Sequence, residues 1–263
     1  MKTLSFVIPV YNEEERLKKT FEALSNPGLP RGLKLQEVIF VDDGSIDNSK
    51  FKIQNSKLLI EKKLKTQIKL ISYKKNQGKG YAIRTGMNHA TADYTLFFDT
   101  DMSTPLSEIK KFVPFMLKEI DVIIGTRKNG KSTVIKHQPF FRETLGKIFT
   151  LIVRIAYQIN TTDVTCGFKA LSRNARLEIF PKAKINRWAY DAELLVIAKK
   201  FGLKTAEQAI TWSNDNSSKV KLYTDIPQTI AELILIYYYH FFNPKAFIAR
   251  YIRFNRYKYI FQT

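Results

Sequence analysis

YTLFFDTDMS, residues 94–103, joins a run of apolar residues to two carboxylates, Asp99 and Asp101, that stand one residue apart. The apolar run predicts a buried strand. Residues two apart in an extended chain point the same way, so both carboxylates can face one point. They repel each other there unless a cation or a proton lies between them. The pair therefore favours a bound cation at the end of this strand.

Carboxylate oxygens are hard ligands, which favour Mg²⁺ or Mn²⁺ over zinc. The alternative is that Asp101 or Ser103 caps a helix expected in the segment that follows, STPLSEIKKF. A cap accounts for one of these residues but not for both acids. We therefore interpret Asp99 and Asp101 as the ligands of a divalent ion that is bound together with a diphosphate.

Strand and helix patterns alternate on both sides of this segment. Strands are predicted over residues 4–10, 37–43, 68–73, 94–99 and 121–127. A helix is expected after the first strand, with Asn12 as N-cap and Glu15 closing a capping box. This alternation predicts an α/β fold with a mostly parallel central sheet flanked by helices.

Each predicted strand ends in charged or glycine-rich residues, and ligands of parallel α/β sheets bind beyond the carboxyl ends of the strands. The five groups are residues 9–13, 42–45, 76–80, 99–101 and 125–127. One such group alone is typical of an ordinary turn. Five on one edge of a sheet predict the rim of an active site.

Composition narrows the function classes further. The chain has 263 residues and a net charge of +19, which points to an anionic partner, although the lysine-rich composition explains part of the excess. Cys166 is the one cysteine, so no internal disulfide can form, which suits a reducing compartment. We expect no signal peptide and no transmembrane helix, because the longest apolar run, 233–242, falls short of the ~18 to 20 residues that span a bilayer.

Seven motifs occur in one order over residues 4 to about 222: FVIPVYNEEERL, VDDGSIDNS, NQGKGYAIRTGM, DTDMS, GTR, DVTCGFKALSR and RWAYDAELL. As a set they resemble the inverting glycosyltransferases of family 2, most of all the dolichyl and polyprenyl phosphate sugar synthases. The resemblance implies a GT-A fold, a nucleotide-sugar donor, Mg²⁺ or Mn²⁺, and a lipid phosphate acceptor. RWAYDAELL is more similar to the dolichyl-phosphate β-glucosyltransferases, which use UDP-glucose, than to the relatives that use GDP-mannose.

The resemblance also implies roles for individual residues on the donor side. Those expected to bind the nucleotide-sugar are Pro9, Tyr11, Glu13, Asp42, Asp43, Lys79, Arg84 and Asp99. Asp99 and Asp101 are expected to bind the metal ion. Arg127 matches a family arginine close to the phosphates. Some relatives place a further metal ligand, a glutamine, two residues beyond the second aspartate, where this chain has Ser103.

A phosphate monoester is largely dianionic at neutral pH, because its second pKa is near ~6, so such an acceptor needs cations more than a base. The departing diphosphate also needs metal, Arg or Lys. The expected catalytic residues are Arg127, Arg142, Lys169, Lys219 and Asp191. Surface charge is the alternative for Arg142 and Lys169, and a helix cap for Asp191. With a sugar hydroxyl as acceptor, Asp191 would have to act as the base.

Two apolar and basic segments are expected to lie at a membrane surface. Residues 145–159 are apolar at helical spacing, and residues 247–261 alternate aromatic residues with arginines. Both patterns suit interfacial helices, with core packing as the alternative for the first and a homo-oligomer interface for the second. We expect a catalytic domain over 1–225, a membrane-associating or oligomerising helical segment over 226–263, and a peripheral protein on the cytoplasmic face of an anionic membrane.

Three functions stay open. The favoured one is transfer of a hexose from UDP-glucose, or alternatively from GDP-mannose, to a polyprenyl or dolichyl phosphate. The second is a family 2 transferase with a glycan hydroxyl as acceptor. The third is a basic module that binds membrane or nucleic acid. Because the motifs with Asp99, Asp101, Lys79 and Arg127 are intact, we expect an enzyme and no nucleic acid partner.

Overall fold

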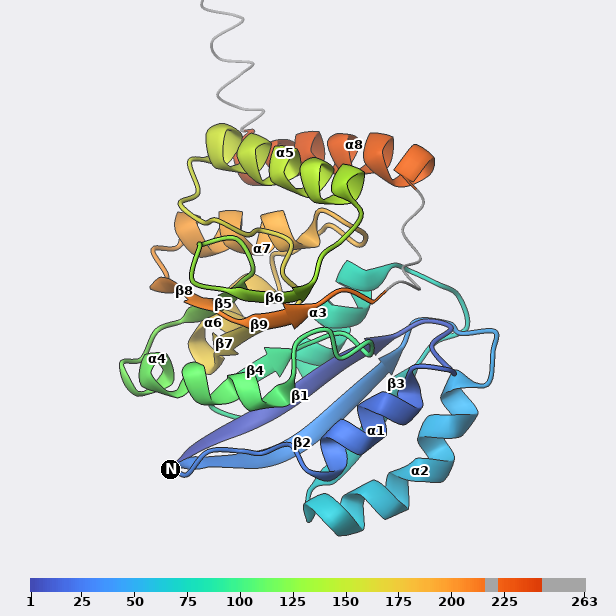
Figure 1. The fold of residues 1–263 in the computed structure, drawn as a ribbon. Helices are drawn as coiled ribbons and strands as arrows, with labels where there is room; N and C mark the ends of the chain where they lie inside the picture. Colours follow the sequence, from blue (N-terminus) through green and yellow to red (C-terminus); the bar gives the residue numbers. More distant parts are fainter. Residues whose placement is uncertain (216–221, 243–263) are drawn as a thin grey trace, which may run out of the picture.

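A seven-stranded sheet runs through the computed structural model of the chain, which describes residues 1–215 and 222–242 (Figure 1). Its strand order is β3-β2-β1-β4-β7-β5-β8. The strands are β1 (Lys2–Val10), β2 (Leu33–Asp42), β3 (Gln67–Ser72), β4 (Tyr94–Phe97), β5 (Val122–Thr126), β7 (Lys169–Ser172) and β8 (Thr205–Ala209). All pairs are parallel except those of β7, which runs antiparallel between β4 and β5. The predicted α/β fold with a mostly parallel sheet is confirmed.

The central strands are almost unbroken apolar runs because both faces of the sheet are covered. Successive side chains of a strand enter opposite cores. Val7 and Phe97 belong to one core, whereas Phe6, Ile8 and Phe40 belong to the other.

Different helices cover the two cores. The core that contains Val7 is covered by α3 (Lys79–His89), α5 (Phe140–Tyr157), α6 (Arg173–Ile179), α7 (Tyr190–Lys200) and α8 (Leu222–His240). The core of Phe6 is covered by α1 (Leu17–Ser25), α2 (Ser49–Leu64), the 3-10 helix η1 (Leu106–Lys111) and α4 (Val113–Leu117). A small parallel ribbon of β6 (Thr133–Lys136) and β9 (Thr211–Ser213) lies between the sheet and α5 (Figure 1).

Helices α5 and α8 lie side by side at the end of the molecule farthest from α2 (Figure 1). The hydroxyl of Tyr157 on α5 donates to the Leu233 carbonyl of α8, and its ring stacks on Phe241. Leu233 and Ile236 are buried, so α8, which spans the expected boundary between residues 225 and 226, contributes to the core. The tail over 243–263 and Lys219 lie outside the described residues. Within the described ranges, no helix has the length and apolar character needed to cross a bilayer.

The helix after β1 begins later than the sequence predicted. It starts at Leu17, and Asn12 has a φ of 55°, whereas an N-cap residue keeps an extended backbone. Asn12 instead connects its loop to the loop after β2: its N–H donates to Ser45 Oγ at 2.9 Å, and its Oδ1 accepts from the Ile46 N–H at 2.8 Å. The capping box predicted for Asn12 and Glu15 is therefore wrong.

Candidate active site

A cavity of about 460 Å³ lies where β1, β2 and β4 end, and we call it the strand-end cavity. Seven of the predicted site residues line it: Pro9, Tyr11, Glu13, Asp43, Lys79, Asp99 and Asp101. The loop before α7 adds Arg187 and Trp188. The parallel strands thus bring residues far apart in the sequence to one edge of the sheet, as ligand sites of such sheets require.

Asp99 and Asp101 both line this cavity, and each is held in a different way. The Lys79 ammonium lies 2.7 Å from Asp99 Oδ1, and the Ser103 N–H donates to Asp101 Oδ1 at 2.8 Å. Burial and the neighbouring charge of Asp99 raise the pKa of Asp101. Burial lowers the pKa of Lys79, but the carboxylates around it outweigh burial, and the net shift is upward. Lys79 is thus one cation beside two carboxylates, Asp99 and Asp101.

The donor set fits a hard divalent ion that is completed by a ligand. Asp99 and Asp101 offer carboxylate oxygens, and the raised pKa of Asp101 shows that a further cation beside it would be stabilising. In the described part of the chain, no group of three or more His, Cys, Asp or Glu side chains is placed to enclose a metal ion. The remaining oxygens would have to come from a bound phosphate or from water, which is usual for Mg²⁺.

Asp43 lines the strand-end cavity and also holds two loops together. Its carboxylate accepts from the N–H groups of Gln77 and Gly78, at 2.8 and 2.9 Å, and from Asn76 Nδ2 at 2.7 Å. Burial raises the pKa of Asp43 despite these hydrogen bonds. The carboxylate therefore fixes the loop after β3 against the loop after β2.

Asp42 and Arg84, two further predicted residues, do not line the strand-end cavity. Asp42 is buried, and its Oδ1 accepts from the Ser45 N–H at 3.1 Å. Arg84 donates to the Ala183 carbonyl at 3.0 Å and to Asn186 Oδ1 at 2.7 Å. Arg84 thereby supports the loop that carries Arg187 and Trp188.

A second cavity, of about 420 Å³, lies between the sheet, α5 and α8, and we call it the helix-walled cavity. Its apolar lining consists mainly of Leu145, Ile148, Phe149, Ile152, Ile226, Ile230 and Leu233. Arg127, Lys128 and Arg142 also line it. Asp99, Asp101 and Trp188 line both cavities, so the two cavities meet at the carboxylate pair.

The guanidinium of Arg127 is held by Asp163, Thr165 and the Trp212 ring. Its Nε and Nη2 donate to the two oxygens of buried Asp163 at 2.7 and 2.8 Å, and Nη2 also donates to Thr165 Oγ1 at 2.9 Å. Its guanidinium lies over the Trp212 ring, 5.2 Å from the centroid. These contacts hold the pKa of Asp163 well below its usual range, even though burial acts in the opposite direction.

Lys169 is completely buried and pairs with Asp191. It also donates to the carbonyls of Val164 and Cys166, so its three hydrogens all have acceptors. Asp191 lines the helix-walled cavity, whereas Lys169 lines neither cavity. Burial raises the pKa of Asp191, although Lys169 and Lys79 oppose this shift. Lys169 therefore acts on the site through Asp191 and through the loop before β7.

Several residues of the site were not predicted from the sequence, among them Arg16, Lys128, Arg187 and Trp188, which line the cavities, and Asp163, which binds Arg127. Arg16 pairs with Glu13 at 3.1 Å and with Asp215 at 2.8 Å, which connects the loop after β1 to the segment after β9. Asp163 and Trp188 lie inside motifs recognised in the sequence, DVTCGFKALSR and RWAYDAELL. No local pattern distinguishes Arg16 or Lys128 from the many other basic residues.

The sheet and the paired carboxylates at the junction of two cavities define a glycosyltransferase with the GT-A fold. Residues 5–180, more than half of the chain, match the model of Glycosyl transferase family 2, and the chain belongs to that family. The family resemblance of the motifs is confirmed, and glycosyltransferase activity follows from it.

Curated relatives are similar over most of the chain. Dolichyl-phosphate beta-glucosyltransferase of Dictyostelium discoideum is 30% identical over 242 residues, which cover 89% of this chain and 73% of the relative. The human protein of the same name is 33% identical over 234 residues, covering 83% and 70%. The Saccharomyces cerevisiae protein is 32% identical over 252 residues, covering 89% and 73%.

Solved structures confirm the fold. Glucosyl-3-phosphoglycerate synthase from Mycobacterium tuberculosis, crystallised with Mn²⁺, UDP and glucosyl-3-phosphoglycerate, superposes with a TM-score of 0.66 at 19% identity, covering 89% of this chain and 80% of that one. The same enzyme with Mn²⁺, UDP-glucose and phosphoglyceric acid gives 0.65 at 18% identity, covering 89% and 79%. At this identity the likeness concerns the fold alone.

Proposed function

We propose that the protein transfers glucose from UDP-glucose to dolichyl phosphate or a related polyprenyl phosphate at a membrane surface. The observation that carries the proposal is the pair of joined cavities. One lies at the strand ends and is lined by several charged residues, and the other combines an apolar wall with cations that include Arg127, Lys128 and Arg142. A phosphate on a long isoprenoid chain has the same combination of charge and apolar surface. The names of the curated relatives support the same reaction.

The strand-end cavity would hold the donor. Pro9, Tyr11 and Glu13 lie on its β1 side, where we expect the base. Asp99 and Asp101 would hold Mg²⁺ or Mn²⁺, which when bound stabilises negative charge on the departing diphosphate. The solved structures with Mn²⁺ and UDP on the same fold support this assignment.

The helix-walled cavity would hold the acceptor. Arg142 lines it, and among the described residues its guanidinium has no hydrogen bond or ion pair, so it is available to a phosphate. Arg127 is already bound to Asp163 and would act mainly by fixing the loop before β7. Our assignment of Lys219 to the acceptor stays a prediction, because this residue is not described.

The meeting point of the cavities supports a single displacement. An acceptor oxygen arriving from the helix-walled cavity would form a bond to the anomeric carbon, while the bond to the diphosphate oxygen breaks on the opposite side and that oxygen keeps the electron pair. This route inverts the configuration at carbon. A phosphate dianion has no proton to lose, so the reaction needs no base, and Asp191 would serve to hold Lys169 and the loop before β7.

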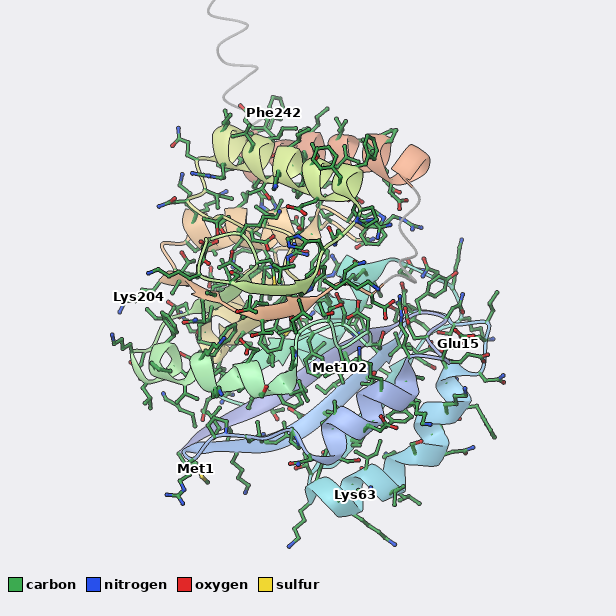
Figure 2. The ribbon with its side chains drawn as sticks, viewed as in Figure 1. Met1, Glu15, Lys63, Met102, Lys204 and Phe242 are labelled. Carbon is green, nitrogen blue, oxygen red and sulfur yellow. The ribbon has the colours of Figure 1, made fainter. Side chains whose placement is uncertain are left out.

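The apolar wall extends to the surface of the molecule. Ile148, Ile152 and Ile230 line the cavity and are also about half exposed. Further exposed apolar side chains of α5 and α8 continue this surface: Phe140, Phe141, Leu151, Ile155, Ile234, Leu235 and Tyr238. Figure 2 shows side chains projecting from these two helices at the end of the molecule where Phe242 lies. Exposed Lys147 and Arg154 on α5 suit an anionic lipid surface, and we propose peripheral attachment through this face.

The test is transfer of labelled sugar into an organic-extractable lipid. Purified protein receives dolichyl phosphate, Mg²⁺ or Mn²⁺, and UDP-glucose or GDP-mannose in parallel. Asp101→Ala is the inactive control, and Glu119→Ala, at an exposed carboxylate paired with Lys2, is the matched active control. We expect lipid-linked glucose from UDP-glucose, absent only with Asp101→Ala.

Other outcomes would overturn parts of the proposal. Product from GDP-mannose alone would replace the donor. Transfer to a glycan but not to lipid would replace the acceptor, and Asp191→Asn should then abolish transfer, because a hydroxyl acceptor needs a base.

A further inference from the structure

The cations of the helix-walled cavity differ in how fully the protein already binds them. Arg127 makes its three contacts to Asp163 and Thr165 at 2.7 to 2.9 Å, and the Trp212 ring covers its guanidinium. Those distances are typical of strong charge-assisted hydrogen bonds. Three of the five N–H donors of Arg127 are therefore used within the described part of the protein, and only the two on Nη1 are left for a ligand.

Lys128, the next residue, lacks a contact of that quality. Its Nζ lies 3.2 Å from the Gly146 carbonyl, and 3.5 Å from both Thr150 Oγ1 and Asp163 Oδ1. Ammonium contacts to carboxylates are normally ≈ 2.7–2.9 Å. Burial and the adjacent charge of Arg127 lower the pKa of Lys128, although Asp163 opposes the shift. The ammonium is therefore incompletely stabilised where it stands.

The charges around Lys128 do not balance. Asp163 is shared by Arg127 and Lys128, and Arg142 enters the same cavity without a described ion pair. Two nearby acids are neutralised elsewhere, Glu143 by Lys147 and Asp191 by Lys169. Arg127 and Lys128 thus share one carboxylate, and Arg142 adds a further positive charge to the cavity. Asp99, Asp101, Asp215 and Asp225 line the same cavity, so the positive excess is local to these three cations, where a phosphate would bind.

We propose that Lys128 binds the phosphate of the acceptor together with Arg142, while Arg127 orients the loop before β7 through Asp163. This inference rests on the proposed function for the identity of the acceptor. The Lys128 ammonium also contacts Gly146 and Thr150 of α5, the helix that supplies Ile148 and Ile152 to the apolar wall. A phosphate bound by Lys128 would therefore lie beside α5 in the helix-walled cavity, where we propose that the lipid chain binds.

Binding without turnover gives the sharpest test. The chain has two tryptophans, Trp188 and Trp212, and both line the helix-walled cavity, so their fluorescence reports its occupation. The two probes are a short-chain polyprenyl phosphate and the uncharged polyprenol of the same length. The variants are Lys128→Met, Lys128→Arg and, as matched control, Lys131→Met at an exposed lysine of the same loop. Binding of UDP with Mn²⁺ is measured in parallel.

We expect Lys128→Met to weaken binding of the polyprenyl phosphate at least tenfold, and to leave polyprenol and UDP binding unchanged. Lys128→Arg should restore most of the affinity, and Lys131→Met should behave as the natural chain. An equal loss for both lipids would mean that Lys128 only holds α5, and no loss for either would exclude a role in binding; both results overturn the inference.

A different result of the same experiment would contradict the proposed function itself. If the natural chain binds polyprenyl phosphate no better than polyprenol, the acceptor assignment falls and the inference falls with it. If the natural chain prefers the phosphate and Lys128→Met keeps that preference, only the role of Lys128 is wrong.

Discussion

Gly167 lies directly against the carboxylate of Asp99: a Cβ atom added at residue 167 would stand 2.5 Å from Asp99 Oδ2. Lys79 holds the other oxygen, Oδ1, at 2.7 Å. The carboxylate is thus fixed between the backbone of the loop before β7 and a cation from α3. This close approach requires glycine for reasons of space.

Gly167→Ala should therefore displace Asp99 and separate it from Lys79. We expect binding of UDP with Mn²⁺ to weaken by about tenfold, equivalent to roughly 1.4 kcal/mol, while the midpoint of thermal unfolding changes little. Titration calorimetry measures the affinity. Gly146→Ala is the control, because its added Cβ makes an ordinary contact of 3.7 Å with Lys128 Nζ, and it should keep full donor affinity. Unchanged donor binding in Gly167→Ala would show that Asp99 can move freely.

The buried ion pair of Lys169 with Asp191 should show strong energetic coupling. Lys169→Met leaves Asp191 buried without its cation, so we expect a loss of about 4 kcal/mol in the free energy of unfolding. In the double variant Lys169→Met/Asp191→Asn the carboxylate charge is gone, and we expect the losses to fall short of additivity by about 2 kcal/mol. Urea unfolding of the four proteins measures the coupling. Additive losses would show that the pair is not formed.

Asp163 should make stability depend on pH under acidic conditions. Its pKa is held below the usual value of about 3.9 in the folded protein, chiefly by Arg127, so the folded state binds fewer protons than the unfolded state. The stabilisation is complete above about pH 5 and is lost as the pH falls through about 3.9 toward the folded pKa.

Asp163→Asn should cost about 3 kcal/mol at pH 7 and should reduce the decline of stability between about pH 4.5 and 3. The urea midpoint measured across this range checks both effects, with Glu119→Gln as an exposed control. A slope equal to that of the natural chain would contradict the ion pair.

Cys166 should be chemically inert in the folded protein. It is buried, and burial together with the charge of Asp163 raises the pKa of its thiol to about 11, so only about one thiol in a thousand is ionised at pH 8. We expect no labelling by iodoacetamide over hours in buffer and complete labelling in urea. Cys166→Ala should keep transfer activity. Rapid labelling of the folded chain would mean that the loop before β7 opens.

Much of the fold could be predicted because its strands are long apolar runs that end in polar residues. The strand predicted over 37–43, for example, is the carboxyl-terminal part of β2. The insertion of β7 could not be predicted in this way. Its four residues, KALS, carry no pattern that shows which strands they join or in which direction. The position of α1 failed because a left-handed Asn12 resembles an N-cap in sequence.

The candidate site was predictable in its residue types and less so in its partners. Asp99 and Asp101 carry their own signal, since two acids after a buried strand need a cation. Lys169 carried no sign that it would be fully buried, because this depends on Asp191, which is 22 residues away in the chain. The sequence does not distinguish Lys128 from other lysines, because its environment is formed by Asp163 and α5, which come together only in the folded protein.

Strand β7 also determines when the enzyme can first work during synthesis. β4 and β5 do not pair with each other, and each pairs with β7, whose Lys169 stands opposite Phe97. A ribosome that has released only the first half of the chain therefore exposes one open edge of β4, with Asp99 unsupported by Gly167. Contacts this distant in sequence form slowly. The joining of β5 to β4 through β7 and the placement of Gly167 against Asp99 are thus a single late event, and a truncated chain that ends before β7 should bind chaperones and have no transferase activity.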